Sequence, residues 1–191
     1  MKKNYLYLTA LLFLLCQFAA LLACAQINQP VIAYVTIQGT KTGTFKGMSL
    51  TKGNEGKIEC IGFKYSASTP HNQATGMVAG KRLHEPFVIM KNIDSSSPQL
   101  LQAAATNETL RTVIIEFYKK SPNGLQGAPS YKITLTNASI SMITQFGGIS
   151  APDRLIPNSN PIEEVSMTFQ KIEFENAEAK TTATDDWNAA Q

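Results

Sequence analysis

The stretch from Glu85 to Ala105 constrains the fold most, because a strand, a tight corner and a helix follow one another within it. Phe87–Met90 is a compact apolar run, typical of a strand that is covered on both faces. Asp94 and the three serines after it offer side-chain oxygens that can cap a helix. Ser97 is the expected N-cap, because Pro98 follows it at the first helical position, where a missing N–H costs nothing.

The helix that follows this corner has an apolar stripe at helical spacing. The stripe consists of Leu100, Leu101, Ala104 and Ala105. We predict that Leu100 and Leu101 belong to the core beside the Asp94, Ser97 and Pro98 cap. No other segment after the first 30 residues has a convincing helical pattern, so one short helix must flank a mainly β domain.

Five further segments are predicted as strands, because they are rich in β-forming residues or alternate apolar and polar residues with a period of two. They are Val31–Gln38, Lys57–Ser68, Leu110–Lys119, Tyr131–Phe146 and Ile162–Glu175. Asn137 and Ala138 permit a bend in the fourth, and Gly62 permits a bulge in the second. Long antiparallel strands with one helix predict a compact β-barrel or a two-sheet sandwich over residues 31–176. Residues 177–191 are expected to form a polar, weakly ordered tail.

The first 25 residues are typical of a bacterial export signal, with Lys2 and Lys3 before a long apolar region. Alanines on both sides of Cys24 favour cleavage before Gln26, which leaves residues 26–30 as a linker. Alternatively, residues 21–24 form a lipobox and leave Cys24 as a lipidated N-terminus. A third reading keeps the segment as an uncleaved membrane anchor. All three readings place the domain outside the cytoplasm, in the periplasm, at the outer membrane or outside the cell.

The composition argues against several functions. The net charge is +3, and about +1 (3 minus 2) without the two leader lysines, so nothing indicates nucleic-acid binding. We find no nucleophile elbow, phosphate loop or zinc-protease motif. The only histidines, His71 and His84, lie in a long polar loop, Thr69–Glu85, without further ligands nearby, and are expected at the surface. Cys60 is expected to be a small buried hydrophobe. We therefore predict no catalytic, cofactor or metal site, and helix capping explains the Asp94–Ser97 cluster.

The order of segments resembles the Hcp family, the haemolysin-coregulated tube proteins of bacterial type VI secretion. The match lies in RLHEPFVIMKNIDSSSPQLLQAAATNE, TVIIEFYKKSPNG, YKITLTNASISMI and EEVSMTFQKIEFE, and in the later TDDW. Together these stretches cover about Tyr34 to Trp187. Each piece is weak alone, but their order and spacing are fairly specific.

This resemblance implies a small β-barrel-like fold and hexameric rings that stack into a tube. It also implies a contractile sheath as a partner and small effectors as cargo in the lumen. The long loop between early strands would help to stack the rings, and here it contains Ser66, His71, Gly76, Gly80 and Arg82. The family's tube proteins have no cleavable leader, which this chain has. The alternative is therefore an exported or lipidated binding module that uses the same fold.

Overall fold

The computed structural model describes residues 31–119, 127–147, 149–151, 154–155 and 160–189. The predicted leader, the linker at 26–30 and the possible lipidation site Cys24 lie outside the described residues. Among those that are described, no helix is both long enough and apolar enough to cross a bilayer.

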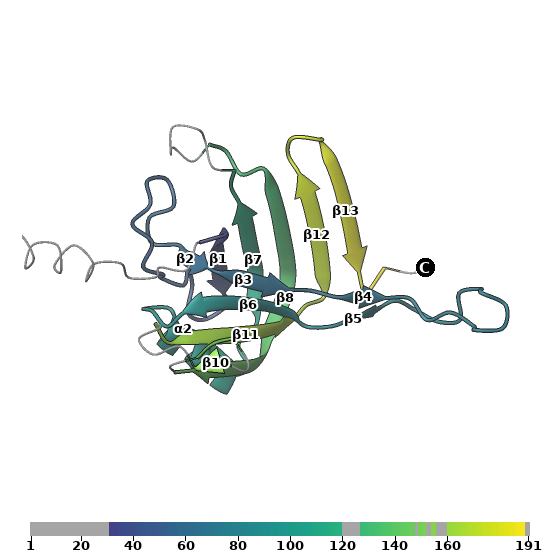
Figure 1. Cartoon of the computed structure of the whole chain (residues 1–191), viewed down its shortest axis with the longest axis horizontal. Helices are drawn as coiled ribbons and strands as arrows, with labels where there is room; N and C mark the ends of the chain where they lie inside the picture. Colours follow the sequence, from purple (N-terminus) through teal and green to yellow (C-terminus); the bar gives the residue numbers. More distant parts are fainter. Residues whose placement is uncertain (1–30, 120–126, 148, 152–153, 156–159, 190–191) are drawn as a thin grey trace, which may run out of the picture.

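Nine antiparallel strands form one hydrogen-bonded sheet, which branches at β8 and folds over into two layers sharing that strand. The first layer contains, in spatial order, β2 (Ile58–Cys60), β1 (Ala33–Gly39), β7 (Leu110–Phe117), the first half of β8 (Tyr131–Phe146), β12 (Lys171–Asn176) and β13 (Thr181–Asp186). The second contains the rest of β8, then β11 (Ile162–Thr168), β6 (Phe87–Asn92) and β3 (Gly62–Lys64). In Figure 1 the first layer stands nearly upright and the second runs nearly level beneath it.

Strands that change layers explain two differences from the sequence prediction. Lys57–Ser68 is not one strand, because β2 pairs with β1 and β3 pairs with β6. Ile162–Glu175 also divides, since β11 and β12 pair with opposite halves of β8. The expected bend in β8 is confirmed at Asn137, whose φ of 49° lies in the left-handed region that asparagine tolerates.

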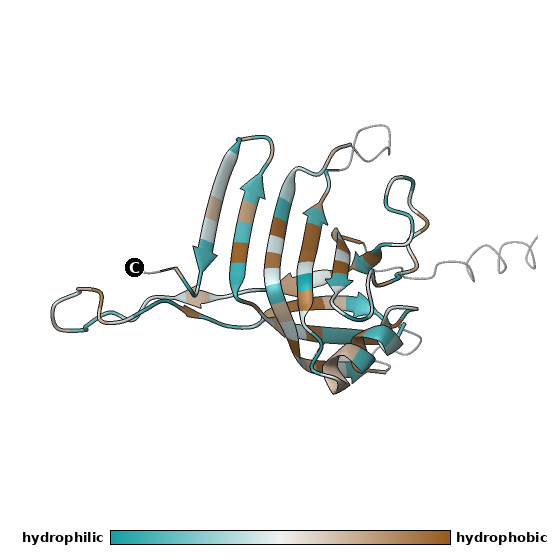
Figure 2. Ribbon diagram, turned by 180° about the vertical axis from the view of Figure 1, so that it is seen from behind, coloured by the Kyte–Doolittle hydropathy of each residue, from teal (hydrophilic) through white to brown (hydrophobic). Residues whose placement is uncertain are grey.

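The core lies between the layers, where the predicted alternation is confirmed. Figure 2 shows hydrophobic and hydrophilic bands alternating along the upright strands. The fully buried side chains include Val35, Ile37, Ile58, Cys60, Phe87, Ile89, Val113, Ile115, Ile133, Leu135, Val165, Met167 and Ile172. The predicted mainly β class with one flanking helix is confirmed, and the sheets form a sandwich rather than a closed barrel.

The helix α2 (Ser97–Ala105) packs against β8, but not with the predicted face. Leu100 and Ala103 are buried, whereas Leu101 is 60% exposed. Assigning Leu101 to the core was therefore wrong. Two stripes of this short helix have helical spacing, one through residues 97, 100 and 103 and the other through residues 101 and 105. Only the contact with β8 decides which of them is buried.

The N-terminus of α2 also differs from the prediction. The N-cap is Ser96, which has helical dihedral angles and makes no side-chain cap bond, and Ser97 is the first helical residue. The Ser97 hydroxyl is not used as a cap, because it bonds to Glu163 and to the backbone of Asp94. Pro98 lies in the first turn, as expected.

Two short strand pairs and the C-terminal hairpin complete the fold. The pairs are β4 (Ala67–Ser68) with β5 (Leu83–His84), and β9 (Ile149–Ala151) with β10 (Arg154–Leu155). The expectation of a weakly ordered tail is wrong for Thr181–Asp186, which form β13 on the outer side of β12.

Candidate functional site

A hairpin arm, residues 66–85, projects far beyond the body of the protein (Figure 1). It has little regular pairing, only Ala67 with His84 and Ser68 with Leu83 in β4 and β5, and one further bridge between His71 and Val78. Every side chain from 71 to 83 is exposed. The apolar side chains Met77, Val78 and Leu83 are 71%, 65% and 55% exposed. Such residues on a projecting element indicate a contact surface.

All five residues predicted for a ring-stacking loop lie on this arm. They are Ser66 at its root, His71 and Gly80 along its length, Gly76 in the turn at its tip and Arg82 near the root on the return strand. Gly76 has a φ of +70°, and its N–H donates to the carbonyl of Asn72 at 2.8 Å, so glycine suits the turn there. Arg82 differs from the others, because its side chain is held against the body.

The root of the arm is attached to the C-terminal hairpin by Asp185 of β13. The Arg82 guanidinium donates through Nε to Oδ2 and through Nη2 to Oδ1 of Asp185, the latter at 2.6 Å. His84 Nε2 lies 3.0 Å from the same Oδ2, and His84 Nδ1 lies 2.6 Å from the Tyr65 hydroxyl. The indole of Trp187 packs edge-on against the His84 ring at 5.2 Å. These five residues form what we call the arm latch.

The electrostatics of the arm latch follow from this geometry. The hydrogen bonds from Arg82, together with that from His84, lower the pKa of Asp185 despite its partial burial. Burial raises the pKa of Tyr65, and the nearby negative charge of Asp185 acts in the same direction. The His84 side chain is only 7% exposed, so the expectation of two surface histidines is confirmed for His71 and wrong for His84.

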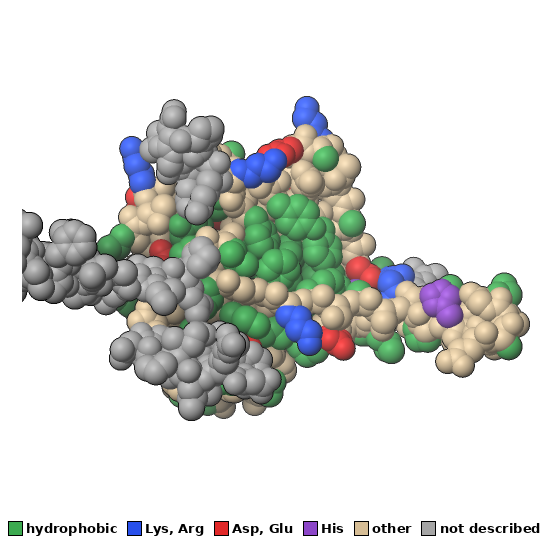
Figure 3. Space-filling model, viewed as in Figure 1, with side chains coloured by type: hydrophobic (Ala, Val, Ile, Leu, Met, Phe, Trp, Pro, Cys, Tyr) green, Lys and Arg blue, Asp and Glu red, His purple; other side chains and the backbone are tan. Residues whose placement is uncertain are grey.

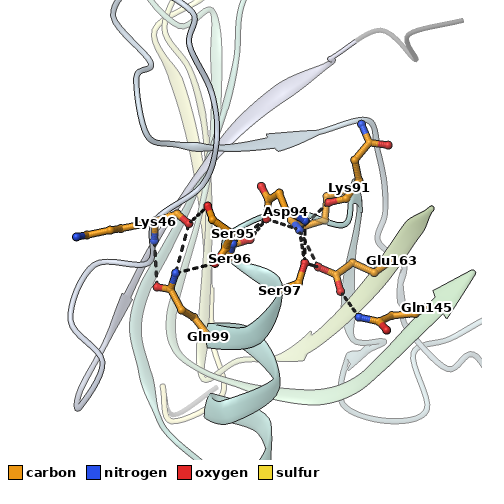
Figure 4. A network of polar contacts seen from close by, with 10 residues as sticks. Lys46, Lys91, Asp94, Ser95, Ser96, Ser97, Gln99, Gln145 and Glu163 are labelled. Carbon is orange, nitrogen blue, oxygen red and sulfur yellow. Dashed lines mark hydrogen bonds and ion pairs between the residues drawn. The ribbon is translucent and has the colours of Figure 1, made fainter. Parts of the chain in front are cut away.

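The Asp94–Ser97 corner contains a buried ionic cluster (Figure 4). The Lys91 ammonium is fully buried, donates to Glu163 Oε1 at 2.7 Å and forms an ion pair with Asp94 Oδ1 at 2.8 Å. It also donates to the Asn92 carbonyl at 2.8 Å and to the Ser97 hydroxyl at 3.2 Å. Glu163 Oε2 accepts from Gln145 of β8 at 3.0 Å. The cluster therefore ties β6, β8, β11 and the start of α2 together.

This cluster is structural rather than catalytic. Ser97 is close to a lysine, but that lysine is paired with two carboxylates and so is not free to act as a base. Ser97 is only 5% exposed, and its hydroxyl already donates to Glu163 at 2.6 Å. Asp94 Oδ1 accepts from the backbone and the hydroxyl of Ser96, which holds the turn. Across the described ranges, no His, Cys, Asp and Glu side chains gather in a way that could hold a metal ion.

Sequence reasoning missed several of these residues, and some had usable signals. Lys91 follows Phe87 and Ile89 in strict alternation, which places it on the buried face of β6. Trp187 is the only tryptophan of the chain, and a lone aromatic residue in a polar tail suggests docking. Asp185 had no local signal, because its partner Arg82 is 103 residues away.

Aromatic side chains continue from the arm latch into the body. Figure 3 shows hydrophobic side chains gathered on the face beside the root of the arm. Tyr65 lies 5.6 Å from Phe174 and 5.8 Å from Phe87, between ring centroids. Phe63, which is 42% exposed, contacts Phe87 and Phe117. The arm root therefore rests on a partly covered aromatic cluster.

Comparison with known proteins agrees with this architecture. Residues 34–175 match the family model described as "Type VI secretion system effector, Hcp". A protein of Pseudomonas aeruginosa named "Major exported protein" is 30% identical over 166 residues, which cover 82% of this chain and 95% of that protein.

Solved structures give the same result. The Hcp1 protein of the E. coli EAEC 042 pathovar superposes with a TM-score of 0.71 at 25% identity, covering 83% of this chain and 99% of that one. The secreted protein Hcp3 of Pseudomonas aeruginosa gives a TM-score of 0.67 at 27% identity, covering 84% and 100%. Because the family model spans most of the chain and the fold agrees over nearly the whole length of these relatives, the chain belongs to the Hcp family of type VI secretion, which is not a family of enzymes.

Proposed function

We propose that this chain is a tube subunit, which associates into hexameric rings that stack and enclose small effector cargo. The observation that carries the proposal is the projecting arm on an otherwise complete Hcp fold. A stacked tube needs an element that reaches from one ring to the next, and the arm extends beyond the body with exposed apolar side chains. The role of Ser66, His71, Gly76, Gly80 and Arg82 in stacking is part of this proposal.

A closed ring also requires a heterologous interface, in which two different surfaces of the same subunit meet. Strand edges with unpaired backbone groups are suitable for such contacts. In the described part of the chain, β13 pairs only with β12, so its outer edge is available. Its sequence, TTATDD, is short and polar, which limits unspecific edge pairing while the subunit is alone.

We further propose that the subunit is exported through the leader at residues 1–25 and forms its rings outside the cell. The name of the Pseudomonas aeruginosa relative supports export in general. Whether Cys24 carries a lipid is decided by mass spectrometry of the native N-terminus after cell fractionation. A lipid on Cys24 would support the alternative of a membrane-attached binding module, and an intact Met1 in the cytoplasmic fraction would reject export through this leader.

The ring is tested by light scattering coupled to size-exclusion chromatography on the chain from Gln26, followed by electron microscopy. A sixfold mass and ring-shaped particles are expected. A monomer at every concentration would overturn the proposal.

Stacking is tested by a variant that combines Met77→Ser and Val78→Ser on the arm. We expect it to form rings but not tubes, because only the exposed apolar contact is removed. Leu101→Ser is the matched control, since Leu101 is 60% exposed but lies on α2. Tubes that persist in the arm variant would show that the arm does not stack the rings.

A further inference from the structure

The direction in which the arm leaves the body depends on few contacts. β4 and β5 contribute two residues each, and a two-stranded hairpin of this size is marginally stable by itself. No side chain from 71 to 83 is buried. The arm therefore cannot hold its own orientation through a core, and contacts at its root must supply it.

We propose that Asp185 is a positioning residue, which fixes the arm against the C-terminal hairpin so that its tip points in one direction. One part of this inference rests on the proposed function: a correctly directed arm is needed to reach the next ring. The orientation itself is a property of the single subunit and is tested separately.

The geometry of the contact supports a positioning role. A guanidinium that donates two parallel bonds to one carboxylate fixes both angle and distance, which a single hydrogen bond does not. The side chains of Asp185 and Arg82 are 21% and 45% exposed, so solvent screens the pair in part. His84, two residues further along the same return strand, adds a bond to this carboxylate.

The surrounding rings restrict the arm in the remaining directions. The His84 ring lies between Trp187 at 5.2 Å and Phe169 at 5.7 Å, both edge-on, and it stacks on Tyr65 at 6.1 Å. Phe169 belongs to the junction between β11 and β12, and Trp187 directly follows β13. Contacts from three parts of the body thus converge on the return strand of the arm, with Asp185 as their charged centre.

A purely structural role would predict a different result. If the contact only stabilised the hairpin β12–β13, its loss would lower the melting temperature while the arm kept its direction. A positioning role predicts a folded protein whose arm samples many directions. The deciding measurement is therefore a distance distribution between the arm and the body.

The experiment uses spin labels at Ala74→Cys on the arm tip and Arg111→Cys on β7, in the full-length chain with Cys16→Ser and Cys24→Ser. Cys60 is fully buried and stays unlabelled. Double electron–electron resonance is expected to give one narrow distance peak in this background. Asp185→Asn should broaden the peak severalfold, and Asp185→Glu, which keeps the charge, should retain most of its sharpness.

Asp186→Asn is the matched control, since the neighbouring carboxylate accepts from the backbone N–H of Asn188. A narrow peak in Asp185→Asn, or equal broadening in Asp186→Asn, would overturn the inference. Trp187 fluorescence gives a label-free check, because the indole is already 51% exposed and opening of the arm latch should increase its quenching by acrylamide further. If the unmodified chain forms no rings, the proposed function fails, whereas the distance measurement still decides the role of Asp185.

Discussion

Replacing Lys91 with methionine is expected to lower the free energy of unfolding by about 3 kcal/mol, near the lower end of the range for breaking a buried ion pair. Methionine fills most of the volume of the lysine, so packing changes little. The loss comes from the charge, because the ammonium is fully buried and faces both Glu163 and Asp94. Without it, two carboxylates remain close together with no cation.

The size of this effect depends on how well the remaining groups of the cluster satisfy the two carboxylates. Several neutral donors remain near the carboxylates, among them Gln145 and Ser97. They compensate partly, which is why the expected cost lies near 3 rather than 5 kcal/mol. A chain of this length loses about 2–4 °C in melting temperature for each kcal/mol, so a decrease of roughly 6–12 °C is expected.

Urea unfolding followed by circular dichroism measures this free energy, and thermal melting gives an independent value. Lys64→Met is the matched control, since Lys64 is exposed on β3, next to β6 in the same layer. The control should change stability by less than about 0.5 kcal/mol. If Lys91→Met cost no more than this control, the cluster would not contribute the stability that its geometry implies.

Three further predictions follow from single positions. Leu100→Ala should lower the free energy of unfolding in urea by about 3–5 kcal/mol, whereas Leu101→Ala should lower it by less than about 0.5 kcal/mol, because only Leu100 is buried. Equal losses for the two variants would show that the buried face of α2 is misassigned. Gly47→Ala should lower the free energy of unfolding by about 1–3 kcal/mol or prevent folding, because the new Cβ would lie 2.2 Å from a backbone carbonyl oxygen. Gly127→Ala is the control, since its Cβ would meet no atom within 4 Å. Burial raises the pKa of Cys60 to about 11, so its reactive thiolate is scarce at neutral pH. Alkylation of the folded protein by iodoacetamide should therefore stay slow until the pH approaches 11 or the chain is unfolded in urea.

Much of this protein was predictable from local sequence alone. Period-two alternation identified β1, β7 and β8, because the side chains of a strand point alternately to its two faces whatever the strand pairs with. The position of the single described helix, with Pro98 in its first turn, was also predictable, since caps and turns are local. The family was recognised because these segments occur in a characteristic order.

Tertiary structure decided the rest, because local periodicity says which residues share a face but not which faces meet. It placed Leu100 rather than Leu101 in the core. It also divided two segments predicted as single strands, Lys57–Ser68 and Ile162–Glu175, between the two layers. It also brought Lys91 to Glu163 across 72 residues and Arg82 to Asp185 across 103. Such contacts depend on the register of strands that are distant in the chain, so the buried cluster and the arm latch exist only in the folded protein.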